Sequence, residues 1–196
     1  MEEFKIDTSE ETAPAEKTGT NIKRYVLDVI ETLVLAILLF LAINAITSRI
    51  RVEGSSMEPT LKNGELLLVN KLAYKFGQPK LGDVIVFHFP GDPTQEYIKR
   101  VIGLPGDDVK IMDGKVKVNG QQIQETYLAA PVNYSGEWNV PEKSLFVLGD
   151  NRNNSSDSHE WGVVPMSKII GKALFVYWPP ERWSTIAHIR ATQSAP

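Results

Sequence analysis

Two adjacent serines stand in a turn-forming segment, GSSMEPT, that runs from Gly54 to Thr60. Glycine ahead of the serines permits a tight backbone turn, and Pro59 prevents a strand from continuing through the segment. A serine presented on such a turn can act as a nucleophile, because neighbouring backbone N–H groups can stabilise the oxyanion that its attack creates. Taken alone, the segment is more typical of an ordinary polar turn.

A lysine stands inside the apolar run YIKRVI, which covers residues 97–102. Alternate side chains of a strand share a face, so Lys99 lies on the face of Tyr97 and Val101. Both faces carry apolar residues, which indicates a strand buried on both sides. Burial lowers the pKa of lysine from about 10.4 by up to about 3–5 units, and a neutral amine near neutral pH is a competent general base. A surface lysine beside a surface arginine is the commoner reading of this motif alone.

Hydrogen-bonding side chains crowd a third segment, GDNRNNSSDSHEWG, at residues 149–162. Such a set can hold a lysine amine, its neighbours and a bound peptide backbone in place. A solvated loop is the alternative interpretation.

These segments need a scaffold, and the chain after Arg49 has the pattern of short strands. Asp113-Gly114 and Asn119-Gly120 are turn signals between or after such runs. The frequent short strands, punctuated by glycine and proline, predict a mainly β, barrel-like domain. Seven runs are rich in β-branched or aromatic residues: ELLLV (65–69), DVIVFHF (83–89), YIKRVI (97–102), VKIM (109–112), KVKV (115–118), SLFVL (144–148) and ALFVYW (173–178).

A largely apolar segment, Tyr25 to Thr47, precedes the strands and is interrupted only in its first half, by Asp28 and Glu31. Its length is near the roughly 20 residues that span a bilayer. A buried helix of a soluble protein and a cleaved signal peptide are the alternatives. Apolar residues on nearly all sides from Leu33 onward favour lipid over a protein core, and the long acidic tail disfavours a signal peptide. We therefore predict an uncleaved membrane anchor.

The composition excludes several function classes. The chain has 196 residues and a net charge of -3, which argues against nucleic-acid binding by bulk electrostatics. It contains no cysteine, which removes thiol nucleophiles and thiolate metal ligands. Its three histidines do not show the helical spacing of a zinc motif, so no metal site is expected.

Together the three segments resemble the type I signal peptidases, also called leader peptidases. The family's Gly-x-Ser-Met-x-Pro-Thr box appears at 54–60, its lysine box at 99–107 and its Gly-Asp-Asn-Arg-x-x-Ser-x-Asp-Ser box at 149–158. Gly82-Asp83-Val84 matches a further family segment. Each box is a weak or moderate signal, but all of them in the family's order behind one anchor are a strong one. The resemblance implies a mainly antiparallel β fold.

The resemblance also implies the roles of individual residues. Ser56 would be the nucleophile and Lys99 the general base of a serine endopeptidase that needs no cofactor. Supporting roles are implied for four residues, with Ser155 orienting the lysine amine, Asp150 paired with Arg100, and Asp157 holding the loop. Shallow pockets for small side chains, one and three residues before the cut, would be formed by Met57, Tyr97 and Ile98.

The sequence departs from the family pattern at two positions. Some members have a serine two residues before the nucleophile, where this chain has Gly54, so the oxyanion hole would use backbone N–H groups, chiefly that of Ser56. Many members have an arginine after the last Asp-Ser, where this chain has His159. A pairing of His159 with Asp157 would depend on the protonation of the histidine.

Three alternatives to a Ser/Lys signal peptidase remain. A Ser-His-Asp hydrolase would use Ser56, His159 and Asp157, but two residues of spacing are awkward for the bond that orients the histidine. A self-cleaving relative is disfavoured because no DNA-binding segment is evident. A non-catalytic, membrane-tethered binding module would have no need of Ser56 and Lys99.

The expected organisation is a disordered tail over residues 1–24, a transmembrane helix over 25–47 and a β-rich peptidase domain over 48–196. The expected partners are precursor proteins with signal peptides and the lipid bilayer, with no nucleic acid. The resemblance implies a single-pass protein of the plasma membrane with its catalytic domain on the extracytoplasmic side.

Overall fold

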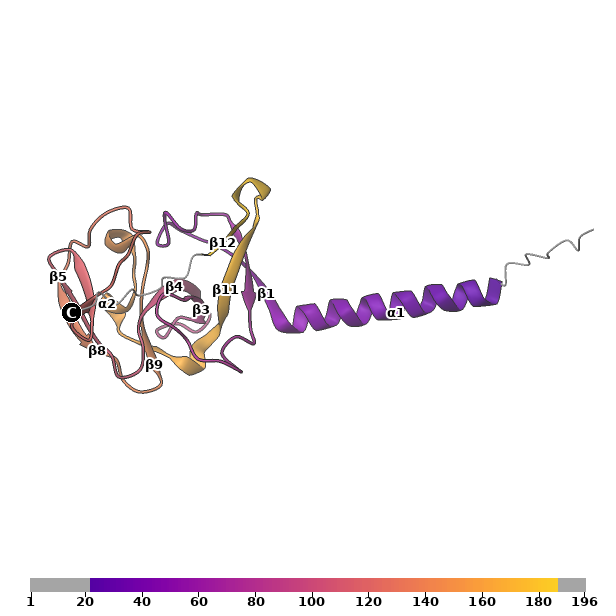
Figure 1. The fold of residues 1–196 in the computed structure, drawn as a ribbon, viewed down its shortest axis with the longest axis horizontal. Helices are drawn as coiled ribbons and strands as arrows, with labels where there is room; N and C mark the ends of the chain where they lie inside the picture. The colour runs from indigo at the N-terminus through magenta and orange to yellow at the C-terminus, as the bar shows by residue number, and fades with distance from the viewer. Residues whose placement is uncertain (1–21, 187–196) are drawn as a thin grey trace, which may run out of the picture. The chain divides into compact units, whose positions relative to one another are not determined.

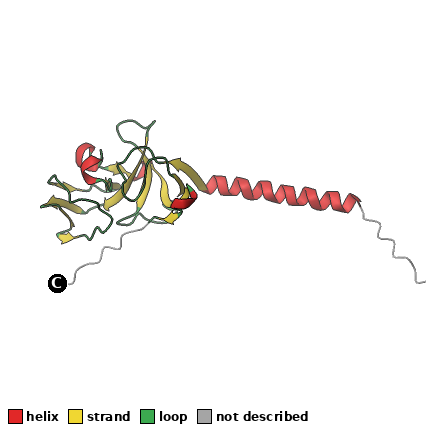
Figure 2. Cartoon of the chain, turned by 90° about the horizontal axis from the view of Figure 1, so that it is seen from above, coloured by secondary structure: helices red, strands yellow, loops and turns green. Residues whose placement is uncertain are grey.

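The computed structural model describes residues 22–186. Contacts within the chain separate a unit that ends at Leu41 from a unit that begins at Ala42. Residues 1–21 of the predicted tail lie outside the described residues. Its last three residues belong to the first helix, which begins at Ile22. Strands, yellow in Figure 2, make up most of the regular structure after that helix.

Helix α1, Ile22–Ile46, is a single run of 25 residues with no buried residue and appears in indigo in Figure 1. At 1.5 Å per residue it is about 37 Å long, more than the roughly 30 Å of a bilayer's hydrocarbon core. It is the one helix among the described residues that is long and apolar enough to cross a membrane. It begins three residues before the predicted span and ends one residue before its predicted end.

The main sheet has the strand order β1-β2-β11-β3-β4-β9-β10, and β12 pairs with β11. All of its strand pairs are antiparallel. Its strands are β1 (Thr47–Arg51), β2 (Leu66–Asn70), β3 (Val84–His88), β4 (Glu96–Gly103), β9 (Ser144–Leu148), β10 (Val164–Pro165), β11 (Ile169–Trp178) and β12 (Ser184–Thr185).

A second, smaller antiparallel sheet has the order β7-β6-β5-β8. Both residues of the Asp113-Gly114 turn have positive φ, 53° and 73°, as a two-residue hairpin between twisted strands requires. The strands are β5 (Asp108–Met112), β6 (Lys115–Val118), β7 (Gln121–Gln122) and β8 (Gly136–Asn139). Short helices complete the described part: η1 (Arg152–Asn154), α2 (Ser158–Trp161), η2 (Met166–Lys168) and η3 (Pro180–Arg182).

The predicted mainly β fold is confirmed, and each of the seven predicted runs coincides with a strand within a few residues. Strand β4 is the element that matters most for function. It lies between β3 and β9, and its apolar side chains enter three separate core clusters: Ile98 packs in one, Val101 in another and Ile102 in the third. The strand is therefore fixed on both faces, and so is Lys99 within it.

Candidate active site

Lys99 and Ser56 lie in hydrogen-bond contact. The amine Nζ of Lys99 donates to the hydroxyl Oγ of Ser56 at 2.8 Å. Lys99 is held on β4 opposite Ile85 of β3, and only 5% of its surface is exposed. The two residues that the family resemblance marked as nucleophile and base thus meet. The burial of Lys99 and Arg100 agrees with the two-sided apolar pattern of the strand and overturns the reading of both as surface residues.

Burial changes the acidity of the Lys99 amine. The loss of solvent lowers the pKa of Lys99 from 10.5 to about 8, although the negative charges of Asp157 and Asp150 oppose that shift. A lysine with this pKa carries a substantial neutral fraction in mildly alkaline solution. When neutral, its lone pair can accept the proton of the Ser56 hydroxyl across the same 2.8 Å contact.

The serine turn is fixed at both of its ends. Gly54 adopts a left-handed backbone with a φ of 82°, and its N–H donates to the side chain of Asn63 at 3.0 Å. After the nucleophile, Met57 is buried in the core, and its carbonyl accepts from the N–H of Leu61 at 2.9 Å. The glycine is therefore needed for its conformation, and the methionine anchors the turn.

The third segment packs directly against the serine turn. The N–H of Asn151 donates to the carbonyl of Ser56 at 2.9 Å, and its side chain donates to the carbonyl of Ser55 at 3.2 Å. A Cβ on Gly149 would lie 2.5 Å from the Ser56 carbonyl oxygen and 2.2 Å from Ser155 Oγ. Only glycine permits so close an approach, and this explains the first residue of the box.

A buried ion pair lies beneath the site. Arg100 Nε and Nη2 donate to the two carboxylate oxygens of Asp150 at 2.8 and 2.6 Å, and both side chains are completely buried. Arg100 Nη1 also donates to the carbonyl of Gly82 at 2.9 Å. The bidentate pair fixes β4 relative to the loop after β9, and the bond to Gly82 joins both to the turn before β3.

Asp157 organises the loop around Gly149. One carboxylate oxygen accepts from the N–H of Gly149 at 2.8 Å. The other lies 2.6 Å from His159 Nδ1, while the ring of His159 stacks on Tyr134 with centroids 4.0 Å apart. Within residues 22–186 no hydrogen bond joins His159 to Ser56, so this geometry favours the lysine over the histidine as the base.

Ser155 is close to the site without contacting the amine through a hydrogen bond. Its Oγ is buried and has no hydrogen-bond partner in the described part of the chain. The orientation of the Lys99 amine by Ser155 therefore stays a prediction.

An open groove of about 890 Å³ runs past the pair. Strand β9 pairs with β4 only from Arg100 onward, which leaves the edge of residues 96–98 on that side without a strand partner among the described residues. The pocket residues Met57, Tyr97 and Ile98 all line the groove together with Ser56 and Lys99. The other lining residues are Arg49, Ile50, Arg51, Val52, Glu53, Gly54, Ser55, Thr94, Gln95, Glu96, Asn154 and Ser156.

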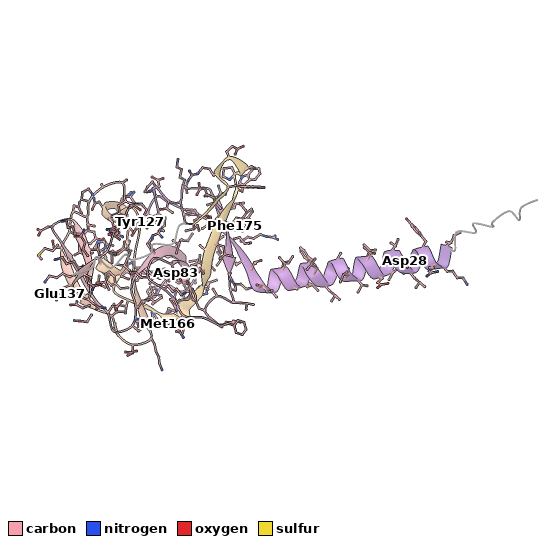
Figure 3. All side chains as sticks on the ribbon, viewed as in Figure 1. Asp28, Asp83, Tyr127, Glu137, Met166 and Phe175 are labelled. Carbon is pink, nitrogen blue, oxygen red and sulfur yellow. The ribbon has the colours of Figure 1, made fainter. Side chains whose placement is uncertain are left out.

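Two parts of the site were not predicted. Strand β1 lines the groove; a strand ahead of the serine turn was plausible from the sequence, but TSRIR has no apolar run that would fix its bounds. A second buried pair, Arg152 with Glu125, has contacts of 2.9 and 2.5 Å. The guanidinium carbons of Arg100 and Arg152 lie 4.2 and 5.9 Å from the ring centroid of Tyr127, which is labelled in Figure 3. Only the family box, which contains Arg152, gave a signal for this pair.

Among residues 22–186 no group of three or more histidine or carboxylate side chains could hold a metal ion.

Comparison with known proteins gives one consistent result. A family model described as signal peptidase, peptidase S26, matches residues 26–178. A signal peptidase I from Leptolyngbya laminosa is 41% identical over 88% of this chain and 90% of its own. A probable signal peptidase I-2 from Synechocystis sp. is 42% identical over 80% of this chain and 75% of its own. A probable thylakoidal processing peptidase 2 from Arabidopsis thaliana is 39% identical over 70% of this chain and 40% of its own.

Proposed function

Because the chain belongs to the signal peptidase family, peptidase S26, and is a serine peptidase, we propose that it removes signal peptides from exported precursors with Ser56 as nucleophile and Lys99 as base. The observation that carries the mechanism is the 2.8 Å contact between the two side chains, made by a lysine that is 5% exposed.

The chemistry follows from the state of the lysine. The neutral amine of Lys99 takes the proton of the Ser56 hydroxyl as Oγ attacks the carbonyl carbon of the scissile bond. Backbone N–H groups of the serine turn, chiefly that of Ser56, stabilise the oxyanion. The ammonium then gives its proton to the leaving amine, and an acyl-enzyme remains. The neutral amine next activates a water molecule, which hydrolyses the ester and restores Ser56.

Four residues position this pair. Asp150 and Arg100 hold β4 and the loop after β9 in register through their buried contacts of 2.8 and 2.6 Å. Asp157 fixes Gly149 against the serine turn. The buried hydroxyl of Ser155, which has no partner within residues 22–186, is available to accept from the Lys99 amine and orient its lone pair.

The groove selects the substrate. The unpaired edge of residues 96–98 offers backbone N–H and C=O groups to an extended peptide, which would add to the sheet as a strand. Met57, Tyr97 and Ile98 form shallow apolar pockets along the groove. Such pockets suit small side chains one and three residues before the cut.

The location follows from the anchor. Residues 25–47 hold the protein in the bilayer as one span, and residues 48–196 form the peptidase domain on the extracytoplasmic side of the plasma membrane. Ser56 lies ten residues after the end of α1, a reach of at most roughly 35 Å. The site is thus available to a precursor emerging at the membrane surface. The relatives include a thylakoidal peptidase, so an internal membrane is the alternative location.

Incubation of the purified full-length protein with a precursor that carries a signal peptide tests the proposal. Sequencing of the new N-terminus should show one cut after a small residue. Ser56→Ala should abolish the cut, and Ser55→Ala should retain it. Cleavage by Ser56→Ala, or loss of cleavage only in Ser55→Ala, would overturn the assignment of the nucleophile.

A further inference from the structure

We propose that the loop Lys71–Lys80 between β2 and β3, here called the basic loop, binds the phosphate headgroups of anionic phospholipids in the bilayer that α1 spans. The inference rests on the proposed membrane anchoring but not on the peptidase mechanism.

The basic loop begins where the anchor ends. In the register of the first hairpin, Thr47 is paired with Asn70, and the N–H of Lys71 donates to the carbonyl of Ile46 at 2.9 Å. Ile46 is the last residue of α1. Phe76 follows Asn70 by six residues, a distance of at most roughly 20 Å. The loop is therefore within reach of the headgroup layer at the end of the span.

The charge of the loop suits an anionic partner. It contains three lysines, Lys71, Lys75 and Lys80, and no acidic residue. None of the ion pairs within residues 22–186 involves these three side chains. Asp83 follows the loop, but one of its carboxylate oxygens already binds Lys172 Nζ at 2.7 Å. Lysines beside a membrane span attract anionic lipids through the negative surface potential.

An aromatic side chain stands at the tip of the loop. Phe76 is 86% exposed, more than any other large apolar side chain of the described residues. Phenylalanine is one of the residues found on the apolar side of segments that lie in the membrane interface, opposite lysine and arginine. An isolated exposed phenylalanine would need no explanation, but this one stands between lysines at the end of a span. Insertion into the interface would remove its apolar surface from water.

A pocket lies between the loop and the start of β11. Tyr74 is fixed there because its hydroxyl donates to Asp83 at 2.9 Å; Asp83 and the lining residue Met166 are labelled in Figure 3. Two ammonium groups at an apolar surface match a lipid phosphate with the first carbons of its chains. The pocket measures about 360 Å³ and is lined by Lys71, Tyr74, Lys75, Met166, Ile169 and Ile170.

The two exposed tryptophans near the end of the described chain are a separate feature. Trp178 is paired with Leu66, at the opposite end of β2 from Asn70, where the basic loop starts. Four residues of strand separate the two ends, about 13 Å. The tryptophans therefore do not belong to the lipid site proposed here.

A single fluorescent label can test the contact, because the chain contains no cysteine. Phe76→Cys and the control Met112→Cys, an exposed apolar position of the second sheet, are each labelled with nitrobenzoxadiazole. The full chain is reconstituted into vesicles of phosphatidylcholine, or of equal parts phosphatidylcholine and phosphatidylglycerol, with a headgroup nitroxide lipid as quencher. We expect severalfold stronger quenching at position 76 than at 112 in the mixed vesicles, reduced in phosphatidylcholine alone and by salt.

A second experiment removes the positive charges of the basic loop. The double variant Lys71→Gln with Lys75→Gln is made in the Phe76→Cys background. The ratio of basic loops in contact with the bilayer to loops free in water, read from the quenching at position 76, should fall about fivefold per lysine. The matched pair Lys115→Gln with Lys117→Gln should change nothing. Equal quenching at positions 76 and 112, no effect of phosphatidylglycerol, or a contact that appears only when a precursor is added would each overturn the proposal. Precursor cleavage is not a readout, so failure of this site and failure of the peptidase mechanism remain distinguishable.

Discussion

The amine of Lys99 has Ser56 Oγ, at 2.8 Å, as its one hydrogen-bond partner within the described residues. A buried ammonium has three donors and is stable only when they are satisfied. One neutral hydroxyl does not compensate for the loss of solvent around a side chain that is 5% exposed. The relationship thus explains why the pKa of Lys99 is lowered to about 8.

Replacing the lysine should stabilise the fold in a pH-dependent way. The folded pKa of about 8 lies below the ordinary value of 10.5, so the folded state carries its full penalty below about pH 8 and loses it as the pH rises toward about 10.5. Near neutral pH the free energy of unfolding of Lys99→Met should therefore equal or exceed that of the parent. The gain is at most about 3 kcal/mol, reduced by the cost of losing the contact with Ser56. Urea denaturation at about pH 7 and about pH 10 measures the difference. A stability difference of the same size at both pH values would contradict the buried, perturbed amine.

Activity should depend on the same proton. We expect kcat/KM of the parent to rise along an alkaline limb with a midpoint near the Lys99 pKa of about 8, because only the neutral amine accepts the serine proton. Lys99→Met and Lys99→Arg should be inactive, since thioether and guanidinium cannot take part. A pH profile of precursor cleavage for the three proteins is the measurement. Substantial cleavage by Lys99→Met would eliminate the proposed base.

Removal of the histidine should have a small effect. His159 holds one oxygen of Asp157 at 2.6 Å, but the other oxygen still binds the N–H of Gly149. We therefore expect His159→Ala to lower kcat/KM by at most about tenfold and to keep the alkaline limb. His159→Arg should restore kcat/KM to the parent value, because the arginine can again contact Asp157. If His159→Ala abolished cleavage while its circular dichroism matched the parent's, a histidine base would gain support instead.

The buried ion pair should dominate stability near the site. Asp150→Asn leaves the completely buried Arg100 without its counter-charge, which typically costs about 3–5 kcal/mol. For a domain of this size the Tm should fall by roughly 10 °C. Glu137→Gln is the control, because Glu137 and its partner Lys110 are 56% and 42% exposed and such pairs contribute at most about 1 kcal/mol. If thermal unfolding gave the same small decrease in Tm for Asp150→Asn and Glu137→Gln, Asp150 would have no bracing role.

The anchor should matter only for substrates in membranes. Deletion of residues 1–41 leaves the unit that begins at Ala42, including every residue of the site. Its kcat/KM on a short soluble peptide should equal that of the full chain. On a precursor embedded in vesicles it should fall by at least about a hundredfold, because co-localisation on one surface is lost. Equal rates on the embedded precursor would remove any role of the span in substrate capture.

Sequence patterns predicted those strands that carry an apolar run. SLFVL, all of whose residues are buried, coincides with β9, and KVKV, in which lysine and valine alternate, coincides with β6. The sequences of β1 (TSRIR) and β8 (GEWN) contain no such run, and their pairing with β2 and β5 defines them. The first residues of β11 were missed because Gly171 interrupts the pattern, although its lack of a side chain is what permits contact with Asn70.

Some features of the candidate site could likewise be predicted from the sequence, and others could not. The apolar residues on both faces of YIKRVI indicated a buried strand, but a surface lysine beside a surface arginine was the commoner reading of the motif alone; the structure buries both Lys99 and Arg100. Which serine the lysine would meet came from the family resemblance, because no local pattern reports a contact between separate segments. The pair of Arg152 and Glu125 shows the limit most clearly, since Arg152 stands in the family box but nothing in the sequence marks Glu125, 27 positions away, as its partner.

The contact between Asn151 and the serine turn has a consequence for the order of events during synthesis. Asn151 lies 96 positions after Ser55, whose carbonyl its side chain holds. A growing chain therefore carries both reactive side chains long before it has the segment that holds the nucleophile in place. Until that segment has left the ribosome, its two contacts with the serine turn cannot form. We therefore expect the proposed catalytic pair to become aligned for proteolysis only after the segment around Asn151 has been synthesised and has folded against the serine turn.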